Sequence, residues 1–127
     1  MNRVRLLKII LVLLLLGLLG WFAAGQYESA RRVVYVIPPG VGSGQVTLDV
    51  PDEIVLTLGV KDTIVIENRD NVVHTFGPFV VAPRTTLTQR FYHAVNYEGV
   101  CTFHRERQMK LVVNPAPWQL HFFYTED

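Results

Sequence analysis

The stretch Glu53-Ile-Val-Leu-Thr-Leu-Gly-Val-Lys-Asp-Thr-Ile-Val-Ile-Glu67 decides the fold class of most of this chain. It contains two short runs of mainly β-branched and apolar residues, Glu53–Leu58 and Thr63–Glu67, separated by the turn residue Gly59. β-branched side chains suit the pleated surface of a strand better than the surface of a helix. We therefore predict a strand over each run.

The same pattern extends over residues 26–127. This part contains 17 Val, 4 Ile and 9 Thr, against only 10 Leu and Ala together. Turn-forming Gly, Pro and Asn residues recur between its apolar runs, as an all-β sandwich requires. The other predicted strands are Val33–Ile37, Gln45–Val50, Phe79–Val81, Thr86–Phe91, Gly99–Phe103 and Lys110–Val113. The sequence thus predicts an all-β sandwich of about seven or eight strands.

The first 27 residues have a different composition. Residues 1–25 hold 18 of the 63 hydrophobic residues in the 127-residue chain. The uncharged run Ile9–Tyr27 would be about 28 Å long as a helix, close to the roughly 30 Å of a bilayer core. Arg3, Arg5 and Lys8 precede it, which favours a cytoplasmic N-terminus and an exported body. We predict a retained transmembrane anchor. A signal peptide cleaved after Gly25 is the alternative, with the body then secreted.

Four segments follow from these patterns: an anchor or signal segment at 1–27, a short stalk at 28–32, a β domain at 33–114 and an aromatic tail at 115–127. The single Cys excludes an intramolecular disulfide and a zinc site built on several cysteines. A net charge of +1 argues against broad nucleic-acid binding. No paired carboxylates or nucleophile–base set is visible, so we predict neither an enzyme nor a small-molecule substrate.

The residues able to bind a metal gather towards the C-terminal end. Cys101-Thr-Phe-His104-Arg-Glu-Arg-Gln-Met109 has a C-x2-H-x4-M spacing, and His74 follows a turn in which Asp70 and Asn71 are predicted turn formers. One thiolate, two imidazoles and one thioether form the ligand set of a blue-copper electron-transfer site. Thiolate stabilises Cu(I), imidazole accommodates both oxidation states, and a weak axial Met tunes the reduction potential.

With these residues, the body resembles a cupredoxin of the plastocyanin and pseudoazurin kind over roughly Val33–Asn114. Asn68-x-Asp70-x-x-x-His74-Thr75 is similar to the first-histidine loop of that family, and Tyr97-Glu98-x-x-Cys101-x-x-His104-x4-Met109 is similar to its C-terminal ligand loop. The resemblance implies a Greek-key sandwich that binds one type 1 copper ion. It also implies the copper ligands His74, Cys101, His104 and Met109, with the edge of His104 as the electron exit.

The chain departs from the family pattern at three places. Phe103 precedes the second histidine, where the family commonly has Pro. Gly99 stands two residues before the cysteine, where the family often has an aromatic residue, and the loop before Met109 is charged. Gln108 therefore stays open as an alternative axial ligand, since Gln is a known substitute for Met. Glu106 is a more remote alternative, which would make a harder and less blue site.

The predicted function is that of a membrane-tethered carrier of single electrons on the exported side of the membrane. Its partners would be redox proteins, such as respiratory or photosynthetic membrane complexes, and Phe103, Arg105 and Arg107 would form a docking rim beside His104. The anchor and the aromatic tail favour an alternative, an accessory or assembly subunit in which copper is secondary or absent. Copper delivery or buffering lacks the His-rich or Met-rich tracts that would support it.

Overall fold

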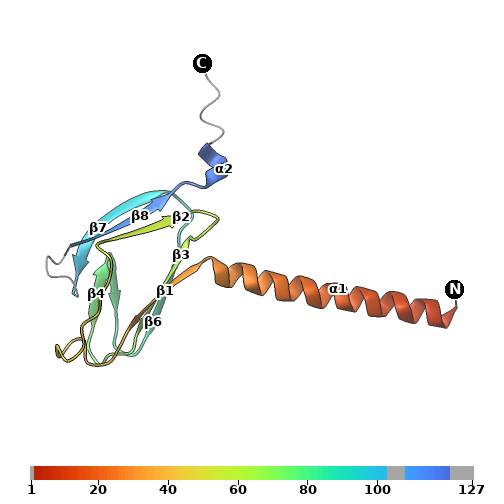
Figure 1. The fold of residues 1–127 in the computed structure, drawn as a ribbon, viewed down its shortest axis with the longest axis horizontal. Coiled ribbons are helices and arrows are strands. Elements are labelled where there is room, and N and C mark those ends of the chain that lie inside the picture. Colours follow the sequence, from red (N-terminus) through yellow and green to blue (C-terminus); the bar gives the residue numbers. More distant parts are fainter. Residues whose placement is uncertain (1, 103–107, 121–127) are drawn as a thin grey trace, which may run out of the picture. The chain divides into compact units, whose positions relative to one another are not determined.

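The structure is a computed structural model that describes residues 2–102 and 108–120. The chain divides into two compact units, with the boundary between Ala30 and Arg31. The first unit is the helix α1, Arg3–Ala30, and the second is β-rich (Figure 1).

The helix α1 has 28 residues, none of which is buried. It is long and apolar enough to cross a membrane, a property that a signal sequence shares. It continues three residues beyond Tyr27, and the first strand begins at Arg32. The segment 28–32, predicted as a stalk, is therefore divided between the end of a helix and the beginning of a strand. The orientation of the helix in a membrane stays a prediction.

The described part of the second unit contains eight strands in two mixed sheets. The smaller sheet has the order β1-β3-β6, and the larger has the order β2-β8-β7-β4-β5. The strands are β1 Arg32–Ile37, β2 Glu53–Thr57, β3 Thr63–Asn68, β4 His74–Gly77, β5 Phe79–Val81, β6 Thr86–Arg90, β7 Val95–Cys101 and β8 Gln108–Asn114. The pairs β1–β3 and β2–β8 are parallel, and the other pairs are antiparallel. Figure 1 shows β2, β8 and β7 side by side.

One hydrophobic core draws side chains from both sheets, which gives the unit a β-sandwich-like architecture. Along β8, Met109, Leu111 and Val113 are buried, whereas Gln108 and Lys110 between them are exposed. This period of two puts one face of the strand against the core. Phe76 of β4 is fully buried, and its ring centroid lies 5.2 Å from that of Tyr35 on β1. The prediction is thus confirmed in its coarser form: the described part of the body is β-rich and sandwich-like.

Three strand predictions differ from the structure. Gly99–Phe103 was a predicted strand, but β7 covers Val95–Cys101 and Thr102 lies in a turn, while Phe103 lies outside the described residues. Gln45–Val50 was a predicted strand, yet within the described part of the chain it belongs to neither sheet. The chain curls back here instead, because the N–H groups of Gln45 and Val46 both donate to the carbonyl of Gly40. Conversely, β4 was not predicted, since four residues with a single large apolar side chain carry almost no periodic signal.

The described part of the aromatic tail forms one helical turn, α2, Pro117–Leu120, rather than a further strand. The ring of Trp118 packs on Gly59, in the turn after β2. The approach is so close that a Cβ on Gly59 would lie only 2.0 Å from the Trp118 ring. Residues 121–127 lie outside the described residues.

Candidate metal centre

Three of the four predicted copper ligands lie on three adjacent strands of the larger sheet. His74 is the first residue of β4, Cys101 is the last of β7, and Met109 is the second of β8. Their exposed fractions are 1%, 0% and 4%. The fourth ligand, His104, lies outside the described residues, as do the docking-rim residues Phe103, Arg105 and Arg107 and the alternative ligand Glu106.

The strand register puts these three side chains on one face of the sheet. Phe76 pairs with Cys101 across β4 and β7, and Gly99 pairs with Met109 across β7 and β8. Since alternate residues of a strand share a face, His74 and Met109 each lie diagonally from Cys101, on opposite sides of it. Diagonal neighbours have Cα atoms about 7–8 Å apart, within reach of long side chains. The sheet therefore brings an imidazole, a thiol and a thioether together at one end of the core.

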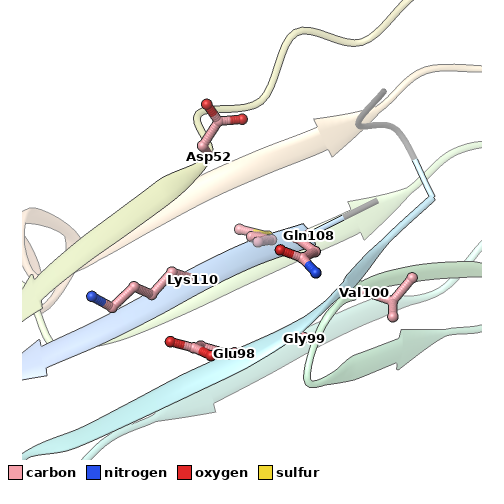
Figure 2. Close-up of a pocket in the computed structure, with 7 residues that line it drawn as sticks. Asp52, Glu98, Gly99, Val100, Gln108 and Lys110 are labelled. Atoms are coloured by element: carbon pink, nitrogen blue, oxygen red, sulfur yellow. The ribbon is translucent and has the colours of Figure 1, made fainter. Parts of the chain in front are cut away.

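The same alternation separates Met109 from its neighbour Gln108. Gln108 is exposed on the outer face of the sheet. It lines an open pocket of about 530 Å³ together with Glu98, Val100 and Lys110, and Met109 also reaches this pocket (Figure 2). Met109 itself is part of the buried core that contains Cys101. Met109, unlike Gln108, therefore lies on the same face of the sheet as Cys101.

His74 is held by a carboxylate that the chain itself buries. Its Nε2 lies 2.8 Å from Oδ2 of Asp70, which is only 2% exposed. The same carboxylate accepts hydrogen bonds from the backbone N–H groups of Gly42 (2.7 Å), Gly40 (3.1 Å) and Asn71 (2.9 Å). The bonds from Gly42, His74 and Gly40 hold the pKa of Asp70 well below its usual range. Because Nε2 is engaged in this way, His74 would bind a metal through Nδ1.

Asn68 organises the loop that leads from β3 to His74. Its side chain is 1% exposed, and its amide nitrogen donates to the carbonyls of Val72, Val81 and Ala82 at 2.9–3.1 Å. Its amide oxygen accepts the N–H of Asp70 at 3.0 Å. Asn68 and Asp70 thus anchor the turn from the interior, whereas Asn71 in the same turn is exposed.

A second contact joins the residues that follow two of the ligands. The Thr75 N–H donates to the hydroxyl of Thr102 at 2.9 Å, and both the N–H and the hydroxyl of Thr102 donate to the Thr75 carbonyl at 3.0 and 3.1 Å. Thr75 follows His74, and Thr102 follows Cys101. The contact fixes the separation of β4 and β7 where each strand carries a predicted ligand.

The departure at Gly99 has a steric cause. A Cβ on Gly99 would lie 2.6 Å from the carbonyl carbon and 2.8 Å from the carbonyl oxygen of Gly77. Backbone atoms cannot yield as a flexible side chain can, so β7 has no room for an aromatic residue here. Gly77 has a φ of +58°, and a Cβ there would lie 3.6 Å from the Met109 sulfur, so the thioether packs beside this crossing.

The donor set is compatible with copper. Two soft sulfur atoms and an imidazole in a buried setting favour copper over the oxygen-seeking cations magnesium and calcium. Over residues 2–102 and 108–120, no three His, Cys, Asp or Glu side chains cluster closely enough to hold a metal by themselves. Of the other predicted ligands, Met109 is described and His104 lies outside the described residues.

Comparisons with protein-family models, with curated proteins and with solved structures found no match. The assignment of the site therefore depends on the residues themselves.

Two residues of this site escaped prediction from the sequence. Asp70 was predicted only as a turn former, although the spacing Asp-x-x-x-His is short enough to place its carboxylate beside the ring. Nothing in the sequence indicated that Gly42 contacts Asp70, because the two residues are 28 positions apart.

Proposed function

We propose that this chain is a membrane-tethered type 1 copper protein with a cupredoxin-like Greek-key domain, which carries single electrons rather than catalysing a reaction. The observation that carries the proposal is the position of His74, Cys101 and Met109 on one buried face of three adjacent strands. A thiolate, imidazole and a thioether are ligands of blue-copper electron-transfer sites, which supports this function.

Each residue would have a defined part. Cys101 would bind copper as a thiolate, His74 through Nδ1 and Met109 as the weak axial ligand, with His104 completing the set. When bound, copper supplies a one-electron couple between Cu(I) and Cu(II). The contact between Thr75 and Thr102 and the bond from Asp70 to His74 would hold the ligands still during that change. A fixed geometry is what rapid electron transfer requires of the protein.

The anchor α1 would keep the domain at the membrane surface, with the N-terminus in the cytoplasm and the domain on the exported side. The edge of His104 would be the electron exit, and Phe103, Arg105 and Arg107 would dock a redox protein with an acidic surface. Electron-transfer rates measured against salt concentration test this arrangement. Arg105→Glu and Arg107→Glu should slow transfer and weaken its dependence on salt, and unchanged rates would contradict the docking rim.

The decisive experiment adds Cu(II) to the purified full-length chain in detergent and records visible absorption and paramagnetic resonance spectra. We expect one copper per chain and an intense thiolate-to-copper band, which Cys101→Ser and His74→Ala abolish. His93→Ala is the matched control, because His93 is exposed and not among the predicted ligands, and it should keep the band. A colourless protein without stoichiometric copper would contradict the proposal and favour the accessory-subunit alternative.

A further inference from the structure

We infer that Asp70 is a positioning residue of the metal centre, which fixes the ring of His74 with its proton on Nε2 and its Nδ1 towards the metal. The inference deepens the proposed function and rests on it. It assigns to Asp70 a role in setting the reduction potential, in addition to its role in the turn.

The hydrogen-bond pattern around the carboxylate carries the argument. Oδ2 accepts the N–H of Gly42 at 2.7 Å, and Oδ1 accepts those of Gly40 and Asn71 at 3.1 and 2.9 Å. Backbone N–H groups can only donate, so both oxygens are acceptors. The contact of 2.8 Å between Oδ2 and Nε2 of His74 then requires the ring nitrogen to be the donor. In the neutral ring, the form that binds a metal, this selects the tautomer whose Nδ1 carries the lone pair.

Burial makes this bond effective. Asp70 and His74 are 2% and 1% exposed, so water does not compete for the bond, and salt screens it little. A carboxylate that accepts the distal N–H of a metal-binding histidine orients its ring and raises its basicity. A more basic ligand stabilises Cu(II) relative to Cu(I). We therefore expect Asp70 to lower the reduction potential of the centre.

The glycine-rich loop between β1 and β2 sets the direction of the carboxylate. A Cβ on Gly42 would lie 3.1 Å from Oδ2 of Asp70 and 2.2 Å from a methyl carbon of Val72. Gly40, with a φ of +91°, adopts a conformation that other residues rarely take. The two glycines let the backbone approach the carboxylate closely, and their amides hold it against His74.

The first test compares Asp70→Asn with the wild type in the full-length, copper-loaded chain. We expect a 10–100-fold loss of Cu(II) affinity with the blue band retained. A tenfold greater loss for Cu(II) than for Cu(I) corresponds to a rise of 59 mV in reduction potential. Asp49→Asn is the matched control, because it removes the same charge from an exposed position and should leave the potential unchanged.

A second measurement needs no variant. Nitrogen-15 NMR of the Cu(I) form, which is diamagnetic, should find the proton of His74 on Nε2. An Nε2 without its proton, or a reduction potential unchanged in Asp70→Asn, would overturn the role of Asp70. The proposed function would still stand in that case, provided that the wild type is blue. A colourless wild type would overturn both. If Asp70→Asn does not fold, the NMR measurement alone decides.

Discussion

Gly99 on β7 lies so close to Gly77 on β4 that a Cβ on Gly99 would come within 2.6 Å of the Gly77 carbonyl carbon. Gly99→Ala should therefore force the two strands apart and lower the free energy of unfolding by about 1–3 kcal/mol, the usual cost of overpacking. It should also disturb the copper spectrum, because Gly99 pairs with Met109. Denaturant titration of the full-length chain followed by circular dichroism measures the first effect.

The neighbouring substitution Val100→Ala serves as the control for Gly99→Ala. Val100 is 56% exposed, so removing its methyl groups should cost less than about 1 kcal/mol. Equal costs for the two variants would show that the close approach of β4 and β7 does not constrain the sheet.

Thr102→Val should weaken the contact between β4 and β7 beside the predicted metal site, without leaving a cavity. The variant keeps the shape of the side chain but loses the hydroxyl that accepts from the Thr75 N–H and donates to its carbonyl. We expect a loss of about 1 kcal/mol in the free energy of unfolding and broader copper resonance lines. Thr88→Val, on the exposed part of β6, is the matched control and should change neither quantity.

The sequence predicts those parts of the fold and site that depend on local pattern. The β-branched runs that became β1, β2 and β3 show their character within five or six residues. Cys101 and Met109 could be paired because they are close in the chain and their sulfur chemistry is distinctive. His74 was predicted as a ligand because it follows an Asx-rich turn, and its place on the same sheet face as Cys101 agrees with that prediction.

Contacts between distant residues could not be predicted in the same way. Gly40 and Gly42 meet Asp70 across 30 and 28 residues of chain. Gly77 and Gly99 meet only because β4 and β7 are neighbours, and β4 itself is too short to carry a period. The curl at Gly40, which replaced a predicted strand at Gln45–Val50, likewise depends on hydrogen bonds rather than on composition.

Asp62 should make the domain sensitive to acid. It is 2% exposed, and burial by itself would raise its pKa; the hydrogen bonds from Arg31 and Gly59 and the charge of Arg31 outweigh burial and lower it below the usual value of 3.8. The unfolded chain then binds the proton more readily. The ionised Asp62 carboxylate therefore contributes its full stabilisation of the folded domain above about pH 5. This contribution is lost as the pH falls through the pKa that Asp62 has in the folded state.

Asp62→Asn tests this linkage. We expect it to lower the free energy of unfolding by about 3 kcal/mol at pH 7, since it leaves the Arg31 charge without its carboxylate. The difference from the wild type should shrink between about pH 5 and pH 3. Asp49→Asn changes an exposed residue, so its free energy of unfolding should keep a constant difference from that of the wild type over this pH range. If the free energies of unfolding of the wild type and Asp62→Asn differ by the same amount at every pH, the pKa of Asp62 is not lowered by folding.

Trp118 and Gly59 provide a double-mutant test of how the C-terminal tail is attached. Gly59→Ala combines two costs, a φ of +76° that disfavours a side chain and a Cβ only 2.0 Å from the Trp118 ring. In the Trp118→Ala background only the backbone cost remains. Gly59→Ala should then lower the free energy of unfolding by about 0.5–3 kcal/mol less than it does in the wild type. Denaturant titration of the four chains measures this coupling. Equal costs in both backgrounds would mean that Trp118 does not rest on the turn in solution, and its large exposed ring would then be available to a partner instead.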